Sequence, residues 1–385
     1  MTPAAYAHLD LEAVRHNLAQ VKRYAPNNKI MAVIKANAYG HGITRVARAL
    51  DQANGLAVAR VDEGVRLRKA GFTQPITVLQ GFVCVDELLL MLQHQLEAVI
   101  HTHQQIDILQ QQNGEPLALS VWLKMDTGMN RLGFKGSDFN TAYQQLAKCA
   151  IVKQPIRLIT HFANADDLLD DKTRRQIELF NDAVRDYPGE RSIANSAGII
   201  GWPLGSARIE SRAEPSGQTQ EKNNDWVRPG LMLYGCSPFA GKTGADFGLK
   251  PVMSLHSRLI SVKHVAAGET VGYSGTWQCQ TDTRLGVVSI GYGDGYHRHT
   301  RSGAPVLVNG QRVPLIGRVS MDMITVDLNS QPNAQPGDPV ILWGGGLPVE
   351  EIARHADTIP YTLLCGITQR VQIVEQVAAD GIQAR

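Results

Sequence analysis

The chain has 385 residues, of which 43% are hydrophobic and 19% are charged, and its formal net charge is +2. This length favours two domains over one, and the interspersed charges form no basic stripe of the kind that binds nucleic acid or an anionic membrane. No apolar run is long enough for a signal-peptide core or a membrane span. The five cysteines are scattered, which favours reduced thiols over disulfides or a metal site and predicts a cytoplasmic protein.

Short apolar runs alternate with amphipathic ones through about residue 240. Helical patterns such as "DLEAVRHNLAQVKRYA", which opens on the candidate N-cap Asp10, separate most of the apolar runs. The predicted strands are residues 29–35, 55–60, 75–81, 96–100, 118–125, 156–163, 191–198 and 225–230. Alternation of this kind is typical of a parallel sheet covered by helices. Eight such strands fit a (β/α)₈ TIM-type barrel, which takes about 250 residues, and a doubly wound sheet is the alternative.

Strands separated by turns dominate the rest of the chain. Within them, "VLVNGQRVPL" predicts a hairpin that turns at Asn309-Gly310. We therefore expect an α/β barrel over residues 1–240 and a mostly-β domain over residues 241–385. The polar segment 205–224 lacks periodicity, which predicts a long loop between the last two barrel strands.

Lys35 follows a buried strand in "MAVIKANAYGHG". A lysine at the carboxyl end of a barrel strand lies on the catalytic face, and an amine of lowered pKa can form a Schiff base with an aldehyde. Taken alone, Lys35 is more simply a solvated lysine. However, polar residues also end the last three predicted strands, with His161 at the sixth, Asn195 and Ser196 at the seventh, and Arg228 at the eighth.

Small residues also follow the seventh and eighth strands, and Gly230 and Leu231 are among them. At these places barrels commonly bind phosphate with backbone N–H groups. A reactive lysine beside a phosphate site describes pyridoxal 5′-phosphate (PLP). We therefore expect PLP at the carboxyl ends of the barrel strands.

A series of spaced motifs carries a resemblance to a known family. They are "VIKANAYGHG", "KMDTGMNRLGF", "THFANAD", "NSAG", "WVRPGLMLYG", "VGYSGTW", "SIGYGDGY" and "GRVSMDM". Together they resemble the alanine racemase family, in order and over nearly the whole chain. The resemblance implies a PLP-dependent interconversion of L-alanine and D-alanine by a homodimer with shared active sites. The enzyme would supply D-alanine for peptidoglycan or degrade it.

The resemblance also implies roles for individual residues. Lys35 would carry PLP and handle the proton of D-alanine, while Tyr273 would act in the other subunit on the proton of L-alanine. One base on each face is the simplest way to invert Cα. His161 and Arg228, linked to Tyr273 by hydrogen bonds, would make its hydroxyl more acidic. The phosphate would be bound by Tyr39, Ser196, Gly230, Leu231 and Tyr361.

Other residues would bind the ring and the substrate. Arg228 would face the pyridine nitrogen, and because an arginine pKa is above about 12, this nitrogen would stay unprotonated. Arg131 and the backbone of Met321 would lie near the substrate carboxylate, and Tyr292 at the entrance or on the inner wall. Lys124 matches a lysine that is often carbamylated and fixes the arginine; the alternative is an ordinary lysine paired with a carboxylate.

Three other functions compete with alanine racemisation. A PLP-dependent amino-acid decarboxylase of the same architecture would have an acidic residue at the pyridine nitrogen and a cysteine motif in its β domain, whereas this chain has Arg228 and no such motif. A non-catalytic PLP carrier would lack the second domain. A racemase for a broader range of small amino acids would typically be exported.

Overall fold

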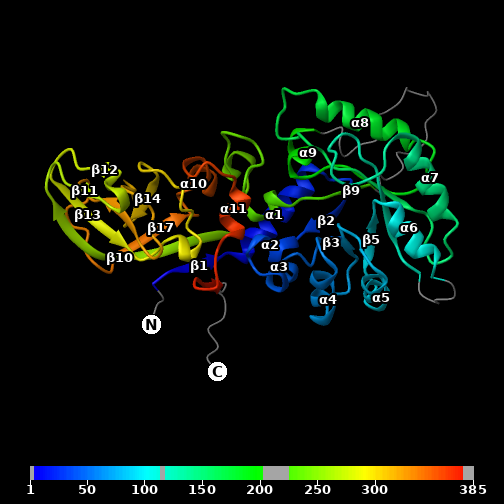
Figure 1. The fold of residues 1–385 in the computed structure, drawn as a ribbon, viewed down its shortest axis with the longest axis horizontal. Coiled ribbons are helices and arrows are strands. Elements are labelled where there is room, and N and C mark those ends of the chain that lie inside the picture. Colours follow the sequence, from blue (N-terminus) through cyan, green and yellow to red (C-terminus); the bar gives the residue numbers. More distant parts are fainter. Residues whose placement is uncertain (1–3, 113–117, 203–224, 376–385) are drawn as a thin grey trace.

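The computed structural model describes residues 4–112, 118–202 and 225–375. They form an elongated molecule with a barrel at one end and a mostly-β domain at the other (Figure 1). The predicted loop over residues 205–224 lies outside the described residues. In the described parts of the chain, no helix is both long enough and apolar enough to cross a membrane.

Eight parallel strands, β2 to β9, close into a barrel in chain order. The closed sheet confirms the predicted (β/α)₈ architecture, and the doubly wound alternative is wrong. Each predicted strand is present but shorter than its apolar run, because only the paired part of each run is extended. The strands are Lys29–Val33, Gly55–Val58, Ile76–Val78, Glu97–Ile100, Val121–Lys124, Arg157–Ile159, Arg191–Ser192 and Trp226–Val227.

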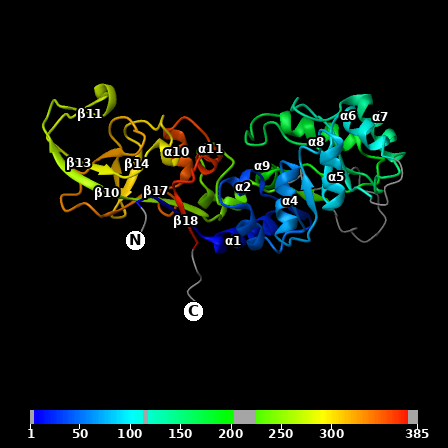
Figure 2. The ribbon, with the colours of Figure 1, turned by 60° about the horizontal axis from the view of Figure 1, so that its bottom comes forward.

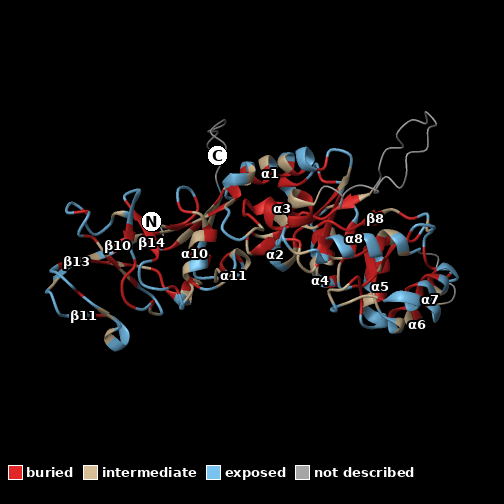
Figure 3. Ribbon diagram, turned by 90° about the horizontal axis from the view of Figure 1, so that it is seen from above, coloured by how far each residue is buried: buried red, intermediate tan, exposed pale blue. Residues whose placement is uncertain are grey.

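Helices surround this barrel, with exposed outer faces around buried strands (Figure 3). The Asp10 carboxylate accepts the N–H of Ala13 at 2.9 Å, which confirms the predicted N-cap. The helices are α1 (Leu11–Tyr24), α3 (Ile43–Ala49), α4 (Val61–Lys69), α5 (Val85–Gln93), α6 (His103–Gln110), α7 (Gly136–Ala147), α8 (Lys172–Ala183) and α9 (Ser196–Gly201).

Partly buried ion pairs lie at the amino-terminal end of the barrel. The Glu97 carboxylate accepts from Thr77 Oγ1 at 2.8 Å and from Trp122 Nε1 at 3.1 Å, and pairs with Arg157 at 2.8 Å. The Arg157 guanidinium also lies 4.6 Å from the centre of the Trp122 ring. A second set of the same kind, formed by Lys29, Glu190 and Trp226, lies at the starts of neighbouring strands. Because these side chains occupy the amino-terminal end, a ligand site can form at the opposite end of the barrel, where the strands have their carboxyl ends.

The second domain is built around one long strand, β10 (Met253–Val265). A sheet of order β15-β14-β17-β10-β1-β18 contains it, while β13 pairs with its carboxyl-terminal half and β16 pairs with β13. Strand β1 (Tyr6–Leu9) comes from the start of the chain, so the division at residues 240 and 241 stays a prediction. The other strands are β13 (Thr283–Val288), β14 (Pro305–Val308), β15 (Gln311–Pro314), β16 (Ile324–Asp327), β17 (Pro339–Trp343) and β18 (Gln372–Glu375).

The predicted hairpin joins β14 and β15. Asn309 and Gly310 form its turn with φ of 51° and 77°, the left-handed values that a two-residue turn of this kind requires. A smaller pair, β11 (Thr270–Val271) and β12 (Trp277–Gln278), lies at the end of the domain farthest from the barrel (Figures 1 and 2). Two helices absent from the prediction, α10 (Val349–His355) and α11 (Pro360–Cys365), lie at the end nearer the barrel.

Buried polar side chains fix the junction after the barrel. The fully buried Asn17 side chain of α1 donates to the carbonyls of Leu233 and Lys250 and accepts the N–H of Lys250. The Glu350 carboxylate of α10 accepts the N–H groups of Ser237 and Gly244 at 2.8 Å each. Because buried polar groups are costly unless they are hydrogen-bonded, these contacts fix the segment that follows the barrel to α1 and α10.

We predict that Glu97→Ala destabilises the protein by about 3 kcal/mol, because it leaves the partly buried Arg157 cation without its carboxylate and the buried Thr77 and Trp122 donors without their acceptor. The matched control is Glu12→Ala, which removes an exposed i,i+3 ion pair with Arg15 and should cost about 0.5 kcal/mol or less. Urea denaturation of both variants measures the difference. Equal, small losses in the two variants would contradict this role of the barrel floor.

Candidate active site

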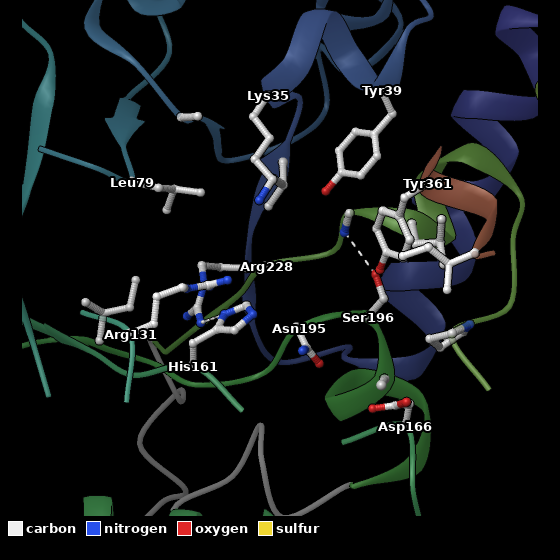
Figure 4. Close-up of a pocket in the computed structure, with 18 of the residues that line it drawn as sticks. Lys35, Tyr39, Leu79, Arg131, His161, Asp166, Asn195, Ser196, Arg228 and Tyr361 are labelled. Atoms are coloured by element: carbon white, nitrogen blue, oxygen red, sulfur yellow. Dashed lines mark hydrogen bonds between the residues drawn. The ribbon is translucent and has the colours of Figure 1, made fainter. Parts of the chain in front are cut away.

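A cavity of about 520 Å³ opens at the carboxyl ends of the barrel strands. Most of its lining comes from the strand ends and the loops that follow them, and α11 of the β domain supplies one wall (Figure 4). The structure brings together these sequence-predicted residues at the cavity: Lys35, Tyr39, Lys124, Arg131, His161, Asn195, Ser196, Arg228, Gly230, Leu231 and Tyr361.

Lys35 opens a turn with unusual backbone geometry. The next four residues, Ala36 to Tyr39, all have left-handed φ values of 52° to 55°. Such a conformation costs about 1–2 kcal/mol for each residue that is not glycine. Hydrogen bonds oppose this cost: Asn37 Oδ1 accepts the N–H of Ile43, and the buried His41 ring bonds through Nδ1 to the carbonyls of Ala38 and Tyr39. The turn directs the side chains of Lys35 and Tyr39 toward the cavity (Figure 4).

Hydroxyl groups and closely approaching backbone form one side of the cavity. Ser196 Oγ accepts the N–H of Gly230 at 2.9 Å, and Asn195 caps α9 by accepting the N–H of Gly198. A Cβ on Gly230 would lie 2.7 Å from the Tyr39 hydroxyl oxygen, so any larger residue here would displace that hydroxyl group. Burial raises the pKa of Tyr39, and also raises that of Tyr361 to about 12. Both phenols are therefore hydrogen-bond donors at neutral pH.

Basic side chains form the opposite side. Arg228 is buried and donates to Ser192 Oγ and to the carbonyl of Thr160, and burial lowers its pKa to about 9, so it remains a cation at neutral pH. Its Nη2 lies 3.3 Å from Nδ1 of His161. Because a guanidinium can only donate, this imidazole nitrogen accepts, and the ring is held neutral.

Burial and neighbouring cations also lower the proton affinity of the other basic groups. Burial, followed by Arg228 and the other cations, lowers the pKa of His161 well below its ordinary value. The same causes lower the pKa of Lys124 to about 7, and burial and then Arg131 lower the pKa of Lys35. An amine of lowered pKa is unprotonated more of the time and can act as a nucleophile or a base.

Three predicted residues do not line this cavity. Tyr273, Tyr292 and Met321 lie in the β domain, and their exposed fractions are 68%, 37% and 52%. Tyr273 begins a short turn between β11 and β12, and that hairpin is at the end of the molecule remote from the barrel (Figure 1). Within one chain, therefore, these side chains and the cavity are separate.

The cavity also contains residues that the sequence interpretation did not single out. Leu79 follows β4, Asp166 follows β7 and Ile359 precedes α11. Asp166 stands in the motif "THFANAD" with His161, which is the one signal that could have identified it. Leu79 and Ile359 have no comparable signal, because an apolar residue beside a strand or helix end is equally typical of a core.

Comparison with known proteins agrees with the whole architecture. Residues 9–238 match the family model "Alanine racemase, N-terminal domain", and residues 252–375 match "Alanine racemase, C-terminal domain". The chain is 47% identical to an alanine racemase of Aeromonas hydrophila, over 96% of this chain and 98% of that protein.

Solved structures show the same agreement. The crystal structure of the biosynthetic alanine racemase from Pseudomonas aeruginosa matches with a TM-score of 0.90 and 42% identity, over 98% of this chain and 100% of that one. An alanine racemase from Bartonella henselae, described with covalently bound pyridoxal phosphate, matches with a TM-score of 0.82 and 27% identity, over 97% and 99% of the two chains. This chain belongs to the alanine racemase family.

Proposed function

We propose that the protein interconverts L-alanine and D-alanine with PLP bound covalently at Lys35. The observation that carries this proposal is the position of the Lys35 amine, between a group of hydroxyl and backbone donors and a group of cations in one cavity. An amine is needed for the aldehyde of the cofactor, the donors suit its phosphate, and the cations suit the carboxylate of an amino acid. The relative from Bartonella henselae, described with covalently bound pyridoxal phosphate, supports the same cofactor.

Specific residues would hold PLP. Tyr39, Ser196 and Tyr361 would bind its phosphate through their hydroxyl groups, together with the backbone of Gly230 and Leu231, where the backbone closely approaches the Tyr39 hydroxyl group. When bound, PLP supplies an electron sink that makes the Cα proton of the amino acid acidic.

The proton transfers need a base on each face of Cα. Lys35, once the substrate amine has displaced it, would be one base, and its lowered pKa increases the share of the unprotonated amine. Tyr273 of the partner subunit is the other base. By this assignment Lys35 exchanges the proton of D-alanine, and Tyr273 exchanges that of L-alanine.

Arg228 favours racemisation over the decarboxylase alternative. It is a buried cation at neutral pH, so it would donate a hydrogen bond to the ring nitrogen and would leave that nitrogen unprotonated. A carboxylate at this position would have the opposite effect. His161, which is neutral and bonded to Arg228, would extend this hydrogen-bond network toward the second base.

Arg131 would bind the substrate carboxylate. Its guanidinium is near enough to both Lys35 and Lys124 to lower their pKa values. Carbamylation of Lys124 stays a prediction, and two features support it: the pKa of Lys124 is lowered to about 7, so the reactive free amine is populated at and above neutral pH, and a carbamate there would place an anion among the surrounding cations.

The exposed positions of three residues favour a homodimer. Tyr273, Tyr292 and Met321 are large apolar side chains of the β domain that a single chain leaves exposed, and the N–H of Gly293, next to Tyr292, bonds to the Met321 carbonyl, so two of them lie close together. Exposed apolar patches in soluble proteins mark binding sites. In a head-to-tail pair of chains, each β domain would cover the barrel mouth of its partner and bring Tyr273 and the Met321 backbone to it, with Tyr292 at the entrance. We favour the supply of D-alanine for peptidoglycan over its degradation, because the Pseudomonas aeruginosa relative is described as biosynthetic.

We predict that PLP attaches to Lys35. After the protein is mixed with PLP and reduced with borohydride, mass spectrometry of its peptides should locate the label on Lys35, because burial and Arg131 keep this amine reactive. The label should be retained in the control Lys69→Ala, which removes an exposed amine on α4, and lost in Lys35→Ala. A label that moves to Lys124, or spreads over surface lysines, would refute the assignment.

The shared site predicts complementation between two inactive variants. Lys35→Ala and Tyr273→Phe should each be inactive alone, but unfolding and refolding them together should restore about one quarter of the wild-type activity, because half of the dimers are then mixed and each mixed dimer retains one intact site. Each variant refolded alone is the control. A mixture as inactive as its components would show that Lys35 of one chain and Tyr273 of the other do not form one active site.

A further inference from the structure

The turn that follows Lys35 needs support from outside itself. Four consecutive residues in the left-handed region cost several kcal/mol in total, and Asn37 and His41 anchor only its middle and end. Its first N–H group, on Ala36, is bonded elsewhere. That N–H donates at 2.7 Å to the carboxylate of Glu63, a residue in the first turn of α4.

Glu63 joins two neighbouring strand ends of the barrel. While its Oε1 accepts from Ala36 after β2, its Oε2 accepts from the N–H groups of Ala59 and Arg60, after β3, at 2.8 and 3.2 Å. The carboxylate therefore fixes the backbone directly beside Lys35 to the next loop around the barrel mouth. Capping of α4 requires only the contacts of Oε2 with the loop after β3, and the contact of Oε1 with Ala36 is additional.

Glu63 also balances the charge around the Lys35 amine. Arg131, Lys124 and His161 face Lys35 from the barrel loops, and Cys365 faces it from α11. Burial and Arg131 lower the pKa of Lys35, whereas Glu63 raises it. A base must keep the proton that it removes, so a carboxylate that offsets the surrounding cations preserves the strength of the base.

We propose that Glu63 is a positioning residue of the racemisation reaction, which holds the left-handed turn and the Lys35 amine in place and supplies a negative charge against the cations of the cavity. The proposal rests on the proposed role of Lys35. It assigns to Glu63 an effect beyond capping, because a cap alone would not change the properties of a lysine on another strand.

The test measures the proton affinity of Lys35 directly, in the full chain freed of cofactor. Lysines are dimethylated with ¹³C-formaldehyde and a borohydride reductant, the Lys35 signal is identified by its loss in Lys35→Ala, and its pKa is read from an NMR titration. Glu63→Gln keeps an acceptor for Ala36 but removes the charge, and should lower this pKa by about half a unit or more. The control Asp62→Asn, which removes the adjacent exposed carboxylate, should leave it at the wild-type value.

A second variant separates charge from reach. Glu63→Asp keeps the charge but is too short for all its contacts, so it should lower the pKa of Lys35 less than Glu63→Gln does. We expect kcat/KM for alanine to fall about tenfold or more in both variants, through a weaker base in Glu63→Gln and through misplacement of the base in Glu63→Asp. Identical Lys35 titrations in Glu63→Gln and wild type would overturn the proposal. Because the titration requires neither PLP nor turnover, its result is independent of whether alanine is the substrate.

Discussion

A closed parallel barrel places the carboxyl ends of all its strands around one opening, and the site depends on this constraint. Residues as distant in the chain as Lys35 and Arg228 meet because β2 and β9 are hydrogen-bonded neighbours in the closed sheet. The opposite end is occupied by paired charges and tryptophans. The chain therefore has one end that stabilises the barrel and another that is available for chemistry.

The electrostatics of that opening explain the choice of ligand. Lys35, Lys124, Arg131 and Arg228 converge on one cavity. Burial lowers the pKa values of Lys35, Lys124 and Arg228, and neighbouring cations lower those of the two lysines further. An arrangement of this kind is costly without anions. A phosphate, a substrate carboxylate and a carbamate at Lys124 would supply them, so the same charges that make Lys35 reactive also select an anionic cofactor and an amino acid.

Much of this architecture follows from the chain's own pattern. The eight barrel strands and the hairpin at Asn309-Gly310 were predictable because apolar alternation and Asn-Gly turns are local signals. Strand β1 was not, because its four residues are extended only by pairing with β10 and β18, which lie far away in the sequence. The left-handed turn was equally hidden, since alanine and tyrosine do not favour positive φ and adopt it here through tertiary contacts.

The site was predictable in the same uneven way. Lys35, His161, Ser196 and Arg228 follow strands and could be placed at the barrel mouth from their positions alone. Tyr361 and Tyr273 could be singled out only by resemblance, because nothing local distinguishes a tyrosine on a short helix or in a strand turn. The structure places Tyr361 at the cavity through α11, while Tyr273 is exposed in the remote part of the β domain.

The central claim is that Lys35 moves the Cα proton of alanine. The most direct measurement is incubation of the protein with PLP and L-alanine in D₂O, with the chirality of the product and the deuterium at Cα read together, beside the Lys35→Ala variant. The account predicts D-alanine with deuterium at Cα, formed by the wild type and not by the variant. An amine formed with loss of CO₂, or a bound cofactor without any turnover of alanine, would contradict it.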